Sequence, residues 1–354
     1  MPSPLSCSIL EHVRESLNIT PYDTLWVPNS TRFVLLGGTA RDLGSFSVYK
    51  MFQGKLENIL RFEHDKPIRC GTFGAYSAAR HIAYGDIGGG LYLVDPEKPS
   101  KPIFSYDSAH NGVVHSIHGC GHPLAQGASE LITGGSDGYV RVWDIRQGSG
   151  PVVEVGPSEA SQKRECWSVC FGGASSDVDR TITAGFDNGD VKMIDLKMGK
   201  LSWQVNVGGG VVSMDFDSIG GPLNKLGVSN LDGNLNIYDL KYFNEKRGYP
   251  SVKTRAHNGT VWRTKFVPTK KDLCVTTGGA GEVKLWKYTY PQERFAVDEV
   301  DGEYGLAGKV SLKSETCIST QPVSSFDWHP NREGLAVCSS FDQSVSVLFV
   351  TDMP

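Results

Sequence analysis

Histidine and cysteine gather in one short stretch of the chain, "HSIHGCGHP" at residues 115–123. It contains His115, His118, Cys120 and His122, and imidazole and thiolate groups are the ligands that zinc prefers in proteins. No second pair of such ligands follows this stretch, and short motif matches are frequently coincidental. We therefore interpret these residues as structural, and we expect neither a metal site nor a bound cofactor.

Glycine-rich stretches could hold a phosphate group. They occur at 88–90, 208–210 and 278–284, and "GLAGKV" at 305–310 contains the pair Gly-Lys. A P-loop needs Ser or Thr after that lysine and a helix that begins there, whereas Val310 follows here. No Gly-x-Ser-x-Gly elbow is present either. We interpret the glycines as turn residues and expect no enzymatic activity.

Composition narrows the classes of protein further. The 354 residues carry a formal net charge of -4 with both signs well mixed, so they lack the basic footprint of a nucleic-acid or membrane-surface binder. Eight cysteines occur without a Cys-x-x-Cys pair, which is typical of buried thiols in a reducing compartment. The first residues resemble no secretory signal, and no apolar run could span a bilayer. We expect a cytoplasmic protein that is monomeric on its own.

These residues must be positioned by a structure, and the sequence indicates a repeated one. A strand, a turn rich in Gly, Asp or Asn, and a second strand recur seven times, as in "ELITGGSDGYVRVWD" at 130–144. A shorter strand precedes each hairpin. Equivalent positions are 44 to 62 residues apart, at Tyr49, Val94, Trp143, Ile194, Tyr238, Trp286 and Leu348. A period in the forties with four strands per unit predicts an all-β, seven-bladed propeller over residues 1–354, in which each sheet covers the next.

The repeated hairpins, and the Trp-Asp ending of the third one, resemble the WD-repeat family. The resemblance covers nearly the whole chain. That resemblance implies a buried hydrogen-bonded set of His, Ser or Thr, Asp and Trp in each complete copy. In the third copy the set would be His110, Thr133, Asp137 and Trp143. Each buried polar group needs its partner, so the loss of one would cost roughly 1–3 kcal/mol.

Other copies depart from the family pattern. The sixth has His257 and Trp286 but carries Ala280 where the turn Asp is expected. The first copy has Leu43 at the turn position and the second has Ile87. We therefore expect only the third copy to be fully hydrogen-bonded and the others to hold mainly by packing.

The last copy needs an outer strand from elsewhere in the chain, because its third strand ends near Val350. "SILEHVRESL" at 8–17 precedes the first inner strand and has no other role. We predict that it is extended, despite a helical appearance, and that it closes the ring as the outer strand of the seventh blade, which removes an exposed edge.

Aromatic residues recur near one end of the inner strands. In the WD-repeat family the residue after the first apolar position of each inner strand lies at the top rim of the channel. The resemblance places there Tyr22, Arg69, His115, Trp167, Val212, Trp262 and Ser324. The residue before the turn acid lies nearby, which adds Phe186, Leu231 and Phe341.

Large aromatic side chains at a concave rim are typical of protein-binding hot spots. We predict that partners bind at Tyr22, Arg69, His115, Trp167, Phe186, Leu231, Trp262 and Phe341. In the alternative, Trp167 and Trp262 pack between blades. Their burial distinguishes the two, because a Trp that binds a partner should be partly exposed in the free protein.

The longest gap between equivalent positions marks an insertion at 289–309, between the third and fourth strands of the sixth blade. It is acidic, and we expect it to leave the bottom face. The simpler interpretation is a solvated loop, and the alternative is a second docking site, because long loops are frequently functional.

Longer stretches resemble one family within the WD-repeat proteins, the Monad family of assembly factors for axonemal dynein arms. They include "KPIRCGTFGA" (66–75), "GGAGEVKLWKYTYP" (278–291) and "STQPVSSFDW" (319–328). The resemblance implies a cytoplasmic scaffold that works with a prefoldin-like co-chaperone complex, a tetratricopeptide adaptor and AAA+ ATPases on dynein heavy chains destined for cilia. A link to apoptosis belongs to the same expectation.

Two other functions are compatible with a propeller. The first is substrate recognition in a ubiquitin ligase or a chromatin complex, in which basic or methylated lysine peptides would bind the aromatic rim. The second is an enzyme, which would need converging acids or a metal. The propeller repeat, the rim aromatics and the resemblance to the Monad family favour a scaffold over both.

Overall fold

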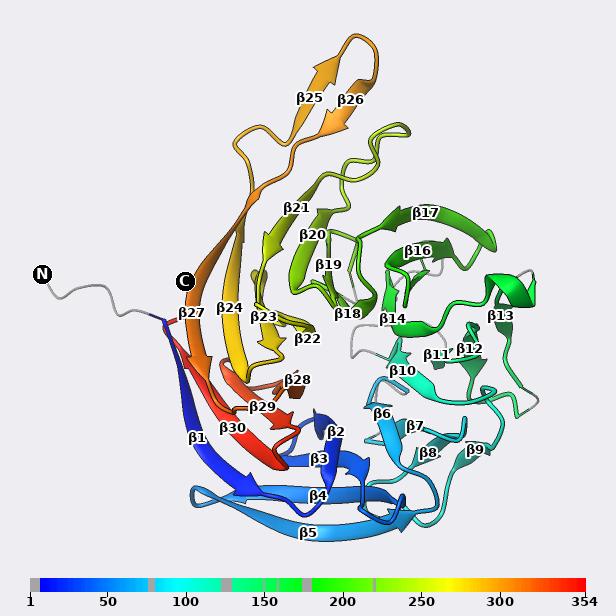
Figure 1. Cartoon of the computed structure of the whole chain (residues 1–354), viewed down its shortest axis with the longest axis vertical. Helices are drawn as coiled ribbons and strands as arrows, with labels where there is room; N and C mark the ends of the chain where they lie inside the picture. Colours follow the sequence, from blue (N-terminus) through cyan, green and yellow to red (C-terminus); the bar gives the residue numbers. More distant parts are fainter. Residues whose placement is uncertain are drawn as a thin grey trace, which may run out of the picture.

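The computed structural model describes residues 7–75, 80–121, 129–148, 150–157, 159–173, 180–218 and 221–354. Within these ranges the regular elements are β-strands, apart from one 3-10 turn, η1 (Ala160–Gln162). Seven four-stranded antiparallel sheets surround a central channel (Figure 1). The prediction of an all-β propeller with seven blades is confirmed. No helix capable of crossing a membrane occurs in the described ranges.

Each of the first six blades is an antiparallel meander that begins with its inner strand at the channel and ends with its outer strand, and the seventh takes its outer strand from the start of the chain. The first blade comprises β2 (Thr20–Trp26), β3 (Arg32–Gly38), β4 (Gly44–Phe52) and β5 (Lys55–His64), and the second comprises β6 (Ile68–Thr72), β7 (Ile82–Asp86), β8 (Leu91–Val94) and β9 (Phe104–Tyr106). The third blade comprises β10 (Val114–Gly119), β11 (Glu130–Gly135), β12 (Val140–Asp144) and β13 (Val153–Val155). The fourth comprises β14 (Cys166–Gly172), β15 (Thr181–Phe186), β16 (Asp190–Asp195) and β17 (Lys200–Asn206). The other three comprise β18 (Val211–Phe216), β19 (Lys225–Asn230), β20 (Asn234–Asp239) and β21 (Ser251–Arg255), then β22 (Val261–Val267), β23 (Lys270–Gly278), β24 (Glu282–Thr289) and β27 (Lys309–Cys317), then β28 (Val323–Trp328), β29 (Leu335–Ser340), β30 (Ser344–Thr351) and β1 (Ser8–Ser16).

The core is divided among the junctions between blades. Apolar side chains alternate along the second and third strands of each blade and meet the inner strand of the next one. Glycine permits the closest of these contacts. A Cβ atom at Gly185 in β15 would lie 2.4 Å from Cγ1 of Val211 in β18, so only glycine lets this valine reach the sheet. Packing of this kind positions every inner strand against its neighbours.

The ring is closed by β1, which pairs antiparallel with β30 from Ser8↔Thr351 to Ser16↔Ser344 (Figure 1). Arg14 of β1 forms an ion pair with Asp342 and donates a hydrogen bond to the carbonyl of Ile318 at 2.8 Å. The predicted extended conformation and the predicted closure by this segment are confirmed. β30 is thereby covered by a strand instead of presenting a free edge.

The third blade contains a complete buried polar set. His110 Nδ1 lies 2.8 Å from Asp137 Oδ1, and His110 Nε2 lies 2.8 Å from Thr133 Oγ1. Trp143 donates its indole N–H to the same Oγ1 at 2.9 Å. Burial alone would raise the pKa of Asp137, but hydrogen bonds from His110 and Arg141 together lower it well below its ordinary value.

The expectation that only this set is complete was wrong. In the sixth blade Glu282 supplies the missing carboxylate, with Oε2 3.1 Å from His257 Nδ1. His257 Nε2 lies 2.8 Å from Thr276 Oγ1, which also accepts the indole N–H of Trp286 at 2.8 Å. A longer side chain two residues after Ala280 therefore reaches the same histidine.

The second blade also uses a histidine that the sequence interpretation missed. His64 stands four residues before Ile68, as His110 does before Val114. Its Nε2 lies 3.1 Å from Oδ2 of Asp86. Asp86 precedes Ile87, which occupies the position where the family pattern has the turn Asp. The spacing of His64 before Ile68 is a signal in the sequence, but the acid lies one residue earlier than the family pattern predicts.

Candidate protein-binding surface

A β-bulge occurs at the same place in all seven inner strands. The pairing register of each strand shifts across one residue near its start, and these residues are Tyr22, Arg69, His115, Trp167, Val212, Trp262 and Ser324. They are the seven positions that the family resemblance placed at the top rim. A bulge bends its strand and redirects the side chain. Six of the seven line the central cavity, and Tyr22 is the exception.

Three aromatic rings form a continuous arc from the sixth blade to the first. The ring centroids of Trp262 and Phe341 are 5.2 Å apart with an interplanar angle of 88°, and those of Phe341 and Tyr22 are 6.4 Å apart at 78°. The Arg69 guanidinium lies 5.4 Å from the centroid of Tyr22. All four side chains are partly exposed. We name Tyr22, Arg69, Trp262 and Phe341 the rim arc.

A second group of side chains, on the third and fourth blades, comprises His115, Glu165 and Trp167. Glu165 Oε2 accepts the indole N–H of Trp167 at 3.0 Å and lies 3.2 Å from His115 Nε2. The indole also covers Gly210, where a Cβ atom would lie 2.5 Å from its Cζ3. Trp167 thus packs against the neighbouring blade and remains partly exposed, and partner binding at this residue stays a prediction.

The remaining predicted residues differ in exposure. Leu231 is 42% exposed and available to a partner. Phe186 is only 8% exposed and belongs to the core between the third and fourth blades, with Lys192 Nζ 5.2 Å from its ring. Ser324 is buried and donates to the Pro21 carbonyl. Phe186 therefore offers a partner little surface, whereas Leu231 extends the accessible rim.

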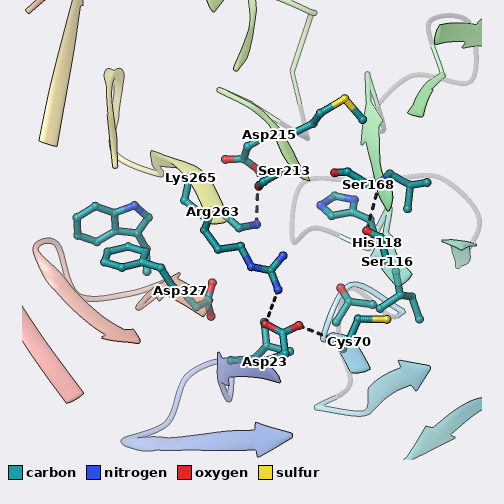
Figure 2. A pocket seen from close by; sticks show the side chains of 18 of the residues that line it. Asp23, Cys70, Ser116, His118, Ser168, Ser213, Asp215, Arg263, Lys265 and Asp327 are labelled. Carbon is teal, nitrogen blue, oxygen red and sulfur yellow. Dashed lines mark hydrogen bonds and ion pairs between the residues drawn. The ribbon is translucent and has the colours of Figure 1, made fainter. Parts of the chain in front are cut away.

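Below the rim, charged residues line a cavity of about 520 Å³. Figure 2 shows Arg263 extending from β22 to Asp23 on β2, with Nη2 2.8 Å from Oδ1. Lys265 Nζ lies 3.6 Å from Asp215 Oδ1. Burial raises the pKa of Asp327 to about 6, and burial also raises the pKa of Asp215.

The acidic side chains of the channel join inner strands together. Each accepts a backbone N–H from the next blade, at 2.8 to 3.0 Å, in the pairs Asp23–Gly71, Asp215–Phe266 and Asp327–Trp26. Serine hydroxyls do the same in the pairs Ser116–Val169, Ser213–Thr264 and Ser325–Thr24. The polar channel therefore connects the blades, and its acids are committed to structure.

The cluster of histidine and cysteine has a structural role within the described residues. His118 Nδ1 accepts the backbone N–H of Phe171 at 3.2 Å, and burial lowers the pKa of His118 to about 3. Cys120 is buried. His122 lies outside the described residues. No group of three metal-ligating side chains occurs in the part of the chain that the structure describes.

The pKa values of the buried thiols argue against their activation. All eight cysteines lie in the described ranges and all are free thiols. Burial raises the pKa of Cys70, Cys166 and Cys274 to about 12. A cysteine nucleophile needs a lowered pKa instead, so these side chains are suited to packing.

Known proteins resemble the chain at two levels. The family model "WD domain, G-beta repeat" matches residues 100–144, which include the complete set of the third blade. "Dynein axonemal assembly factor 10" of Xenopus laevis is 42% identical over 100% of this chain and 99% of its own length. The proteins of the same name from Homo sapiens and Chlamydomonas reinhardtii are 42% and 40% identical over 98% of this chain and 97% of their own lengths. The chain therefore belongs to the dynein axonemal assembly factor 10 family of WD-repeat proteins.

Proposed function

We propose that this protein is a non-enzymatic scaffold that holds other proteins during the cytoplasmic assembly of axonemal dynein arms. The observation that carries the proposal is the partly exposed rim arc at the mouth of the channel. The likeness to dynein axonemal assembly factors over almost the full chain supports the process in which it acts. The raised pKa values of the buried thiols favour a scaffold over a thiol-dependent enzyme.

The partners of this scaffold are a prefoldin-like co-chaperone complex, a tetratricopeptide adaptor, AAA+ ATPases and dynein heavy chains. Large aromatic and arginine side chains dominate the binding energy of protein interfaces, and truncation of such a residue costs about 2 kcal/mol or more in affinity. Trp262 and Phe341 stand edge to face, so a partner meets a pre-formed surface and little conformational entropy is lost on binding. The apoptosis link stays an expectation from the resemblance.

Recognition of methylated lysine has less support at this surface. A cage for a quaternary ammonium group needs aromatic faces open to the cation. Arg69 already lies over the ring of Tyr22, and Phe341 meets both of its aromatic neighbours edge to face. The rim arc therefore suits an apolar or aromatic segment of a partner better than a methylated lysine.

The test is an affinity capture from the cytosol of ciliated cells, read by mass spectrometry. The baits are the wild-type chain, the Trp167→Ala/Trp262→Ala variant, and Phe52→Ala as a control that removes an aromatic ring 47% exposed and remote from the rim. Co-chaperone subunits and dynein heavy chains are expected with the wild type and the control and not with the double variant. Equal capture by all three baits would move the contact away from the rim, and capture by none would refute the scaffold role.

A further inference from the structure

The insertion in the sixth blade forms a small sheet of its own. Its strands, β25 (Phe295–Asp298) and β26 (Gly302–Gly305), pair from Phe295↔Gly305 to Asp298↔Gly302. In the described ranges neither strand joins one of the blades. Figure 1 shows the hairpin standing outside the ring, beyond the outer strands. Because it connects β24 to β27, it leaves the end of the blade opposite the rim arc.

The neighbouring blade holds this hairpin in a fixed orientation. Asn244, in the loop after β20, donates its side-chain N–H groups to the carbonyls of Asp301 and Glu303 at 2.8 and 3.0 Å. The Arg247 guanidinium lies 3.9 Å from the ring centroid of Tyr304 and 2.7 Å from Asp301 Oδ2. A loop that is only solvated would not need such contacts with a neighbouring blade.

The two faces of the hairpin have different surroundings. Tyr304 and Asp298 share one face with Ala296, and both contact Arg247. Phe295 and Val297 belong to the opposite face, which they share with Glu303. Phe295 is 45% exposed and its ring centroid lies 5.7 Å from that of Tyr242, whereas Val297 is 75% exposed. Val300 at the tip is 78% exposed. Apolar side chains held this far into water on a fixed element are typical of interaction sites.

The backbone of β25 also has a free edge. Leu306 donates its N–H to the carbonyl of Arg294 at 2.9 Å, so the pair 294↔306 is hydrogen-bonded. Hydrogen-bonded pairs alternate along antiparallel strands, which assigns Ala296 and Asp298 to the bonds with β26. Phe295 and Val297 then direct their N–H and C=O groups away from β26, at the unpaired edge.

The charge of the hairpin restricts what can cover it. Lys246, Arg247 and Arg294 are committed to acids at short range. Glu293, Glu299 and Glu303 are exposed, and none of them has an ion pair within the described residues. A second copy of this chain would bring like charges together, whereas a basic segment would neutralise them.

We propose that the edge of β25 binds an extended segment of a partner protein that carries apolar and basic residues on one and the same face. The segment adds to the sheet as a third strand, with its backbone paired to Phe295 and Val297 and its apolar residues on their face. Its lysine or arginine residues share that face, near Glu303, which pairs with Val297, and near Glu293 and Glu299 at the ends of β25. This site is independent of the rim arc and of the scaffold function proposed for that rim.

The test measures fluorescence anisotropy with a short labelled peptide in which valine and lysine take turns at every second position, with threonine between them, so that valine and lysine share one face of a strand. Binding to the full chain is expected, with affinity about tenfold or more lower for Val297→Asp. Nonspecific electrostatic attraction cannot explain a lower affinity of Val297→Asp, because the added negative charge would strengthen the attraction of the basic peptide. Val297→Pro, which removes the edge N–H, is expected to weaken binding as well. Leu201→Asp, on a residue 52% exposed in β17, is the matched control and should leave binding unchanged.

Three further results would overturn the proposal. The first is no binding to the wild type, and the second is equal binding of a peptide methylated at the backbone nitrogens, which would mean that no strand is added. The third is a dimer in light scattering that Val297→Asp dissociates, which would make a second copy the occupant. The Trp167→Ala/Trp262→Ala variant should bind the peptide normally, so failure at the rim and failure at the hairpin remain distinguishable.

Discussion

Arg263 and Asp23 form an ion pair across the channel, with Arg263 Nη2 2.8 Å from Asp23 Oδ1 although the residues are 240 positions apart. Arg263 comes from the inner strand of the sixth blade and Asp23 from that of the first. The same carboxylate accepts the N–H of Gly71 in the second blade and the hydroxyl of Ser325 in the seventh. One side chain therefore connects four blades.

Asp23→Ala is expected to lower the free energy of unfolding by about 2–4 kcal/mol. The change leaves Arg263 without its carboxylate and the N–H of Gly71 without its acceptor. Urea titration monitored by tryptophan fluorescence measures the difference. Asp23→Asn is the control, because the amide oxygen can still accept from Gly71, and its loss should be smaller. A change below about 0.5 kcal/mol for Asp23→Ala would contradict the connecting role.

Glu282→Ala is expected to cost about 1–3 kcal/mol of stability, because the buried His257 loses the partner of its Nδ1. A second substitution in the same chain, Ala280→Asp, should recover part of that loss, since it restores the acid at the position used by Asp137 in the third blade. Thermal unfolding by calorimetry reports both changes. Full stability of Glu282→Ala alone would mean that this carboxylate does not support the histidine.

Asp327→Asn is expected to stabilise the protein at pH 7.5 by about 1–3 kcal/mol and to have little effect near pH 4. Burial raises the pKa of this carboxyl to about 6, above its ordinary value of 3.8. The folded chain therefore holds the proton more tightly than the unfolded chain, and stability falls as the pH rises from about 4 to about 6. Asn keeps the acceptor for the N–H of Trp26 without a charge.

The measurement for Asp327→Asn is the difference in unfolding free energy from wild type across that pH range. The charge of the neighbouring Lys265 favours the ionised carboxylate, and it is already included in the net upward shift. A difference that does not vary with pH would show that the carboxyl is not the titrating group.

Ile9→Ala is expected to destabilise the protein by about 2–4 kcal/mol. Ile9 on β1 is 7% exposed and packs in the core between the sixth and seventh blades. The adjacent Leu10 is 53% exposed, so Leu10→Ala should change stability by less than about 0.5 kcal/mol. Urea titration of both variants tests whether β1 contributes to the core or only covers an edge. Equal effects would favour the second role.

The repeat was readable from the sequence because strand periodicity and turn chemistry are local properties. The hairpin at 130–144 contains its own turn signal, and the spacing of its equivalents predicts the number of blades. The role of 8–17 followed by elimination, since the seventh unit lacked a strand. The complete set of the third blade and the seven residues at the bulges came from the family resemblance at fixed positions.

The tertiary structure decided the contacts between residues that are distant in sequence, and those of residues that lie away from the positions of the family pattern. Glu282 reaches His257 from two residues beyond the expected place because its side chain is longer than that of Asp. Phe186 is buried although its position predicts a rim residue, because it packs in the core that its blade shares with the preceding, third blade. The hairpin of β25 and β26 is fixed by Asn244 and Arg247, which lie in another blade. The ion pair of Arg263 with Asp23 has no sequence signal, because only closure of the ring brings the two strands to one channel.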